Sequence, residues 1–262
     1  MARYFIKLSY RGAPFHGWQV QPGEVTVQSV IEESLAKILG RPVPITGAGR
    51  TDAGVNARMM IAHFDSEPSL ENDSNFLRSI NALVGRDIAI DSIISVHDEA
   101  HARFDATSRT YRYFAASSKS PFLYPLTWKA GPLLDYDKMN EAAELLLKTD
   151  DFASFAKLHS DSKTTLCKVT SAKWMSVGSG VMAFEITADR FLRNMVRAVV
   201  GTLVDVGRGK ISIADFGTII ESKNRCSAGT SMPPNALFLW RVDYPYFDSE
   251  NSIYNPITLK NE

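Results

Sequence analysis

The chain has 262 residues, of which 45% are hydrophobic and 22% are charged, so it is long enough for one large domain or two modest ones with an ample core. Lysines and arginines total 29, aspartates and glutamates also total 29, and the formal net charge is therefore zero. Cys167 and Cys226 are the only cysteines, which excludes a disulfide framework or a cysteine-rich zinc site and fits a reducing compartment.

Targeting segments and metal-binding motifs are missing from the sequence. No apolar signal region follows Met1, and no segment approaches the length of a membrane span, so we expect a cytoplasmic protein with no membrane partner. The five histidines form no H-E-x-x-H motif, and no metal is expected.

The neutral total conceals an uneven distribution of charge. Residues 103–129 hold five basic side chains and one acidic one, and residues 190–210 hold the same numbers, whereas residues 135–151 hold six acids and two lysines. A polyanion responds to such a local basic face rather than to the net charge. Ordinary solvated charge explains either cluster taken singly, so the clusters allow a nucleic-acid partner without establishing one.

The first half of the chain predicts the element order β-α-β-β-α-β. Thr26 is expected to cap the first helix and Gly40 to end it, and Ser74 and Gly85 are expected to do the same for the second. The predicted elements are a strand at 3–10, a helix at 26–39, strands on either side of 47–57, a helix from 74 to 85 and a strand at 88–96.

The second half predicts the same order with one further helix. Two of its strands are joined across Gly178-Ser179-Gly180, a strong hairpin signal. The predicted elements are strands at 107–116, 166–177, 181–188 and 236–242 and helices at 136–148, 191–206 and 212–222. Two β-α-β-β-α-β units in tandem predict two split-βαβ halves whose antiparallel sheets join around a central cleft.

We expect the chain to divide into three parts. These are an N-terminal α+β half at 1–104, a C-terminal α+β half at 105–247, and a tail at 248–262. The duplication rests on the order of the elements, because no residue-level repeat is visible.

The loop 47–57 packs three glycines, an arginine and one carboxylate between two apolar runs. Glycines let a backbone turn through positive φ or approach a ligand closely, and a charged pair on a turn anchored by strands suits holding a reactive group. We interpret Asp52 as that group and Arg50 as a phosphate or backbone contact. The alternative is a polar hairpin turn, in which Asp and Gly are favoured anyway.

The predicted strand at 107–116 alternates basic and aromatic residues. Residues i and i+2 of a strand share a face, so Arg109, Tyr111 and Tyr113 line one side, and Thr110 and Arg112 line the other. Aromatic rings beside arginines suit stacking on an unpaired base. A half-buried strand, in which tyrosine is common, is the alternative.

The predicted helix at 191–206 has an apolar stripe that is expected to face the core. Arg190, Arg193, Asn194 and Arg197 fall on the opposite side. Arginines at i and i+4 repel each other unless an anion lies near them. Solvent and an anionic group, either a carboxylate or a phosphate, both remain open as the surroundings of this face.

The combination of these motifs resembles the tRNA pseudouridine synthase A family over nearly the whole chain. The G-R-T-D-x-G-V element is highly specific, and the other stretches follow in the family's order and spacing. The stretches are Ser9–Gly12 through Gly17–Gln19 with Thr26–Gln28, Gly49–Val55, His101–Phe104 through Tyr111–Tyr113, Phe191 through Met195–Arg197 with Gly201, and Leu237–Pro245.

The resemblance implies the pseudouridine synthase fold, an α+β fold in which two ferredoxin-like (βαββαβ) halves form a continuous mixed, mainly antiparallel sheet with a central basic cleft. It implies isomerisation of uridine to pseudouridine at positions 38 to 40 of the tRNA anticodon stem-loop, by a homodimer that needs no cofactor or metal. By matching motif positions, it implies Asp52 as the catalytic aspartate, Tyr111 as the tyrosine that meets the flipped base, and Arg197 as the arginine that pairs with the aspartate.

The implied reaction breaks the N1–C1′ bond, turns the base and forms a C5–C1′ bond, so the carboxylate must be ionised to act on the sugar. Burial favours protonation of a carboxylate, and the guanidinium of Arg197 would oppose it. Tyr111 would stack on the uracil and is a candidate acceptor for the C5 proton. Because the target uridine must leave its stack, Arg50, Arg58 and Arg103 are expected to hold the RNA backbone.

The sequence departs from the family pattern in three places. Asn56 stands where histidine is common, Arg193 and Asn194 stand where histidines are often found, and residues 228–234 match their counterpart only loosely. These departures bear on contacts with RNA rather than on the chemistry.

Two other functions account for parts of the sequence. In a non-catalytic RNA-binding module, Asp52 would be a turn residue. In a mononucleotide-binding enzyme, Gly47-Ala48-Gly49 would be a phosphate loop, but such a loop opens a helix. Residues 57–64 predict a strand, so the sequence speaks against the second alternative.

Overall fold

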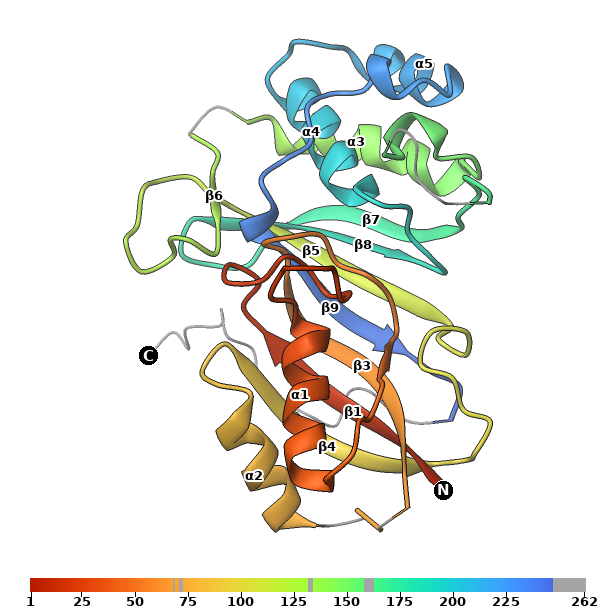
Figure 1. Cartoon of the computed structure of the whole chain (residues 1–262). Coiled ribbons are helices and arrows are strands. Elements are labelled where there is room, and N and C mark those ends of the chain that lie inside the picture. Colours follow the sequence, from red (N-terminus) through yellow and green to blue (C-terminus); the bar gives the residue numbers. More distant parts are fainter. Residues whose placement is uncertain (68, 71–72, 132–133, 158–162, 247–262) are drawn as a thin grey trace. The chain divides into compact units, whose positions relative to one another are not determined.

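The computed structural model describes residues 1–67, 69–70, 73–131, 134–157 and 163–246. These residues form two compact units, coloured red to yellow and yellow-green to blue along most of their lengths (Figure 1). Unit 1 comprises Met1–Thr107 together with the described residues from Leu239 on, and unit 2 comprises Ser108–Phe238. Each unit contains a β-sheet and helices, which confirms the predicted α+β class.

Two expectations about the arrangement of the whole chain stay predictions. One is the division into 1–104, 105–247 and 248–262, of which the tail at 248–262 lies outside the described residues. The other is the joining of the two halves into one continuous sheet around a basic cleft.

Unit 1 has the predicted β-α-β-β-α-β order. Its elements are β1 (Ala2–Tyr10), α1 (Val27–Leu39), β2 (Thr46–Gly47), β3 (Asn56–Ser66), α2 (Ser74–Leu83) and β4 (Ile88–Val96), joined by most of β9 (Leu237–Asp243). The strand order is β4-β1-β3-β9, with β2 paired to β3. Because β1 is antiparallel to both neighbours, Ile6 lies opposite Ala62 on one side and Ile93 on the other.

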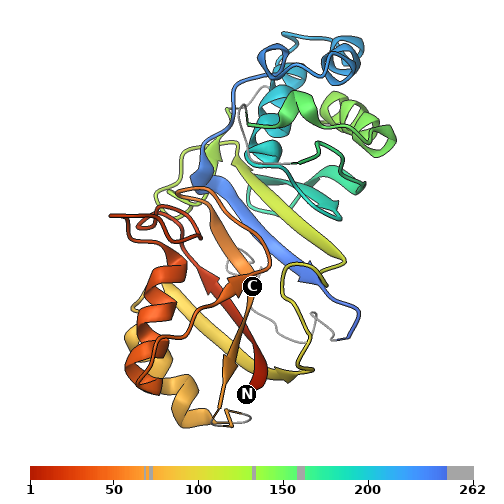
Figure 2. The same ribbon diagram turned by 45° about the vertical axis from the view of Figure 1, so that its right-hand side comes forward.

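Both helices of unit 1 lie on the same face of its sheet (Figure 2). Val27, Ile31 and Leu35 of α1 are buried, and their spacing of four residues places them on one side of the helix. Thr26 caps α1 through a capping box, and Gly40 ends it with a φ of 69°, as predicted.

The predicted cap of α2 is wrong by one residue. The Asp73 carboxylate accepts hydrogen bonds from the backbone N–H groups of Asn75 at 3.0 Å and Phe76 at 2.9 Å. Ser74 is therefore the first helical residue rather than the cap. A carboxylate satisfies the unpaired N–H groups as a hydroxyl does, and its charge also suits the positive end of the helix.

Unit 2 combines β-strands with three helices. Its elements are β5 (Ser108–Ala116), β6 (Trp128–Lys129), α3 (Tyr136–Glu144), β7 (Val169–Ser176), β8 (Val181–Ala188), α4 (Met195–Gly207) and α5 (Ile213–Glu221), with single 3₁₀ turns between them. The strands follow the order β5-β8-β7, all antiparallel, and β6 lies parallel to β5. Gly178, Ser179 and Gly180 have positive φ and close the predicted hairpin between β7 and β8.

The predicted start of α4 at Phe191 is wrong by four residues. Asn194 has a φ of 66°, in the left-handed region, so the helix starts only at Met195. Arg190 and Arg193 therefore precede the helix, and they do not share a helical face with Arg197. Asparagine tolerates this conformation better than most residues, so the backbone can adopt it directly before the helix.

None of the helices in the described residues is long and apolar enough to cross a membrane.

Candidate active site

The predicted reactive group, Asp52, lies in the loop that joins β2 to β3. Its own carbonyl accepts a hydrogen bond from the N–H of Val55 at 3.1 Å, which closes a four-residue turn. Gly54 occupies the third position of that turn with a φ of 79°, a conformation that favours glycine. Asp52 is partly exposed and Arg50 is exposed, so the turn presents both side chains at the surface of unit 1.

A second loop, residues 10–18, braces this turn. The Tyr10 hydroxyl is 2.8 Å from the Thr51 hydroxyl, and the backbone N–H of Trp18 donates to the Thr51 carbonyl at 3.2 Å. Gly17 lies so close that a side chain there would meet the same carbonyl, and a side chain at Gly47 would meet the Trp18 ring. The glycines therefore serve the close approach of two loops, which holds Asp52 in a defined place.

The sequence did not predict this brace between the loop 10–18 and the turn that carries Asp52. The glycines of 47–57 are expected to allow either positive φ or close approach to a ligand, and Gly54 shows the first of these. Gly47 instead packs against a tryptophan, and nothing lies within 4 Å of a side chain added at Gly49.

Arg58 and Arg103 are the other predicted substrate-binding residues of unit 1. Arg58 lies on β3, and its guanidinium carbon is 4.7 Å from the centre of the Trp240 ring, a cation–π contact with β9. Lys7 of β1 is buried, and this burial lowers its pKa. The charge of Asp91 opposes this lowering of the pKa, and the charge of Arg58 adds to it. Arg103 lies in the turn after β4 and is exposed.

Tyr111 lies on β5 of unit 2. Its ring meets Phe191 edge-to-face, with centroids 5.0 Å apart and planes at 82°. The Thr110 and Thr187 hydroxyls are 2.8 Å apart, and Arg112 pairs with Glu185 at 2.6 Å. These two contacts confirm that Thr110 and Arg112 share a face, and the alternation of the strand places Tyr111 on the other.

Tyr113 follows Tyr111 on that same face and is completely buried. Its hydroxyl has no hydrogen-bond partner among the described residues. Burial raises the pKa of this hydroxyl, and the positive charge of Arg197 opposes the rise.

Arg197 lies in the first turn of α4 and is held by the segment before β9. Its Nε donates to the Met232 carbonyl at 2.6 Å, and its own carbonyl accepts from the Met232 N–H at 3.1 Å. A side chain at Gly201 would collide with the Thr230 carbonyl, so the segment lies directly on the helix. The guanidinium is thus fixed at its base by backbone contacts.

Comparison with known proteins identifies the family. The tRNA pseudouridine synthase A of Parabacteroides distasonis is 53% identical to this chain over 245 residues, which cover 94% of this chain and 97% of that protein. The chain belongs to the tRNA pseudouridine synthase A family. The family protein of Bacillus licheniformis is 37% identical over 241 residues, 90% of this chain and 97% of its own, and a family model described as tRNA pseudouridine synthase matches residues 142–245. The predicted family is therefore confirmed.

A solved structure, a Cbf5-Nop10-Gar1 complex, contains a chain that matches 90% of this one and 57% of its own length. The TM-score is 0.33 and the identity 11%, so this likeness carries no argument.

The departures from the family pattern have structural roles in this member. The Asn56 side-chain oxygen accepts from the Gly12 N–H at 2.8 Å and is buried, so it ties the loop 10–18 to β3. Asn194 donates to the Ser231 hydroxyl at 2.6 Å, and Arg225 donates to the same hydroxyl at 2.9 Å. The loosely matching segment 228–234 is thereby anchored to α4.

The predicted site residues are distributed over both units. Asp52, Arg50, Arg58 and Arg103 belong to unit 1, and Tyr111 and Arg197 belong to unit 2. The meeting of Asp52 with Tyr111 and Arg197 therefore stays a prediction, as do the roles of all six residues.

Parts of the two basic clusters are neutralised locally. Arg112 pairs with Glu185 at 2.6 Å, and Lys210 pairs with Asp205 at 3.1 Å. For these two side chains, ordinary ion pairing is the better interpretation.

Metal ligation finds no ready-made site in the part of the chain that the structure describes, where no group of three or more His, Cys, Asp or Glu side chains converges. His97 and His101 are four residues apart but follow β4 in non-helical backbone, so they do not form a helical ligand pair.

Proposed function

We propose that this protein isomerises uridine to pseudouridine in tRNA, at positions 38 to 40 of the anticodon stem-loop. The observation that carries the proposal is the match over 94% of the chain to a tRNA pseudouridine synthase A, with the G-R-T-D-x-G-V element on a braced, surface-presented turn. A rigid turn suits a reaction in which one carboxylate must act on one carbon of an extruded nucleotide.

Asp52 is the catalytic carboxylate of this proposal. The reaction breaks the N1–C1′ bond of uridine, and Asp52 acts on the sugar while the uracil turns. The C5–C1′ bond then forms, C5 loses its proton and N1, freed from the sugar, gains one, so the product is an isomer and no group is gained or lost. A carboxylate serves this chemistry only when it is ionised.

Arg197 is the arginine that keeps Asp52 ionised when the two meet. Its Nε contact with the Met232 carbonyl fixes the direction of the guanidinium. A fixed guanidinium presents a planar pair of donors to a carboxylate, and its charge lowers the pKa of such a partner.

Tyr111 receives the uracil. Its ring is held by the edge-to-face contact with Phe191, which supports a stacking role during rotation of the base. Its hydroxyl is the proposed acceptor of the C5 proton. Arg50, Arg58 and Arg103 hold the RNA backbone, since guanidinium groups bind phosphates in planar geometry.

The remaining parts of the proposal concern the cell and the assembly. The protein works in the cytoplasm, as a homodimer, on tRNA and without a cofactor. The homodimer is tested by light scattering of the purified protein at concentrations around those used for activity, where a monomer mass would refute it.

The experiment that tests the function is tritium release from C5-labelled tRNA. The wild-type protein should release tritium, and Asp52→Asn should release none while its Kd for tRNA stays within about tenfold of wild type. Full activity of Asp52→Asn would refute its assignment. Binding without tritium release by the wild-type protein would favour the non-catalytic RNA-binding module.

A further inference from the structure

The turn that follows β4, residues 101–105, presents an aromatic ring to solvent. Phe104 is 76% exposed, and its ring stacks on the imidazole of His101 with centroids 4.2 Å apart and planes at 30°. The guanidinium carbon of Arg103 lies 5.9 Å from the centre of the same ring. A single exposed apolar residue is ordinary, and Phe104 is distinguished from one by the contacts that hold its ring.

The turn is closed by its own side chains. Nδ1 of His101 accepts from the backbone N–H groups of Arg103 at 3.1 Å and Phe104 at 3.2 Å. The Asp105 carboxylate accepts from the His101 N–H at 2.7 Å, and the Asp105 N–H donates back to the His101 carbonyl at 3.0 Å. These bonds fix the backbone of Phe104 directly beside the ring on which it stacks.

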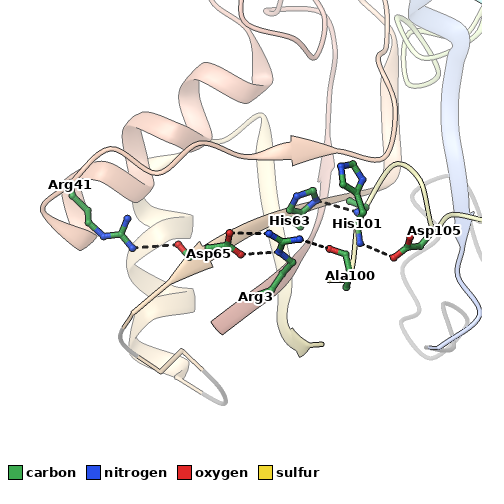
Figure 3. Close-up of polar contacts among 8 residues, drawn as sticks. Arg3, Arg41, His63, Asp65, Ala100, His101 and Asp105 are labelled. Carbon is green, nitrogen blue, oxygen red and sulfur yellow. Dashed lines mark hydrogen bonds and ion pairs between the residues drawn. The ribbon is translucent and has the colours of Figure 1, made fainter. Parts of the chain in front are cut away.

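The sheet of unit 1 anchors the turn through His63 and Arg3 (Figure 3). Nδ1 of His63 on β3 accepts from the Ala102 N–H at 3.1 Å. Arg3 on β1 donates to the Ala100 carbonyl at 3.0 Å while it pairs with Asp65 through two bonds of 2.8 and 3.0 Å. The exposed ring is therefore carried on a preorganised support rather than on a loose loop, which lowers the entropy cost of binding through it.

We propose that Phe104 is an RNA-binding residue on which an unpaired base of the substrate stacks, with Arg103 contacting the neighbouring phosphate. The inference rests on the proposed function, because it takes RNA as the ligand. An aromatic ring beside a guanidinium is the combination that binds single nucleotides, since every base has a stacking face and every nucleotide a phosphate. A protein partner would need a surface of many residues, whereas the turn offers one ring and one cation.

The chain offers a matched control in Phe122. It is 94% exposed, and it makes no ring or cation–π contact with another of the described residues. Phe122→Ala removes an exposed phenyl ring that lacks such a support, so it separates the effect of the supported ring from a general effect of surface hydrophobicity.

The test is the Kd of the full-length protein for unmodified tRNA, measured for Phe104→Ala, Phe104→Leu, Phe104→Tyr and Phe122→Ala. Base–aromatic stacking predicts that Phe104→Ala and Phe104→Leu weaken binding at least about fivefold. Phe104→Tyr keeps the ring and should bind within about twofold of wild type, as should Phe122→Ala. A Kd for Phe104→Ala within about twofold of wild type, or full affinity of Phe104→Leu, would overturn the proposal.

Two further measurements keep the result specific. Phe104→Ala should leave the slope of log Kd against log salt unchanged, whereas Arg103→Gln should reduce it by about one, because only the second removes a phosphate contact. An equal loss of slope in both variants would contradict the stacking role. Tritium release by the wild-type protein is measured in parallel: its absence refutes the proposed function, whereas unchanged binding of Phe104→Ala in an active enzyme refutes this inference alone.

Discussion

The two units hold their predicted site residues in different ways. In unit 1, the turn that carries Asp52 is braced by a second loop through backbone contacts that glycines make possible, as at Gly17. In unit 2, Arg197 is positioned through its own side chain, by the bond from Nε to the Met232 carbonyl. The comparison teaches that a reactive group can be held by the shape of the backbone or by one side-chain anchor, and the two designs should fail differently.

The two units also differ in whether a buried polar side chain finds a hydrogen-bond partner. In unit 1, Nδ1 of the buried His63 accepts a backbone N–H. In unit 2, the hydroxyl of the buried Tyr113 has no partner among the described residues. A satisfied buried group supports stability, and an unsatisfied one costs about 1–3 kcal/mol.

The largest expected effect comes from breaking the side-chain anchor of unit 2. Arg197→Lys should lower kcat/KM on the order of 100-fold, because lysine lacks both the Nε donor and the planar fork. The free energy of unfolding should change by less than about 1 kcal/mol, since one partly exposed contact is lost. Single-turnover assays and urea unfolding measure the two.

Arg208→Lys is the control for Arg197→Lys. Arg208 is an exposed arginine just after the last turn of the same helix, outside the proposed site. A drop in activity of the same size in both variants would mean that Arg197 has no special position.

Disrupting the backbone brace of unit 1 should lower the stability of the protein and not only its activity. Gly17→Ala should lower the free energy of unfolding by at least about 2 kcal/mol, because Gly17 has a φ of 87° and a side chain there would meet the Thr51 carbonyl. Gly49→Ala should stay within about 0.5 kcal/mol, since nothing lies within 4 Å of the added carbon. Equal denaturation midpoints for the two variants would rule out the brace.

The satisfied imidazole of unit 1 predicts a pH dependence of stability. Burial, assisted by the charges of His101 and Arg3, lowers the pKa of His63 to about 4, and Asp65 and Asp105 oppose the change. The unfolded chain, with a histidine pKa of about 6.5, binds the proton first as the pH falls. Stability is therefore complete above about pH 6.5 and declines by up to about 1.4 kcal/mol per pH unit down to about pH 4.

His63→Asn tests this assignment, because the asparagine oxygen can accept the Ala102 N–H but does not titrate. Guanidinium unfolding at several pH values from about 7.5 to about 4.5 should give a flatter profile for His63→Asn than for wild type. A profile for His63→Asn as steep as that of wild type would show that groups other than His63 cause the pH dependence.

The smallest expected effect comes from the unsatisfied phenol of unit 2. Tyr113→Phe removes a buried hydroxyl that has no partner among the described residues, so the free energy of unfolding should stay the same or rise by up to about 1 kcal/mol. A clear loss of stability in Tyr113→Phe, measured by thermal unfolding, would show that the hydroxyl has a partner in solution.

Tyr111→Phe should instead slow tritium release at saturating tRNA if its hydroxyl accepts the C5 proton.

The sequence by itself determined the elements that depend on local signals. Thr26 and Gly40 bound α1, and the Gly178-Ser179-Gly180 turn joins β7 to β8, because capping and positive φ are properties of a few neighbouring residues. It also determined the family, because the G-R-T-D-x-G-V motif is specific. The relatives match this chain over most of its length.

Only the tertiary structure decided what these residues contact. Tyr10 and Trp18 brace Thr51, and Met232 anchors Arg197, so these contacts join segments that no local pattern connects. The late start of α4 depends on one backbone angle, at Asn194, that such contacts select. The physical reason is that a propensity acts over one or two turns of chain. Close packing, by contrast, is decided between residues that are tens of positions apart.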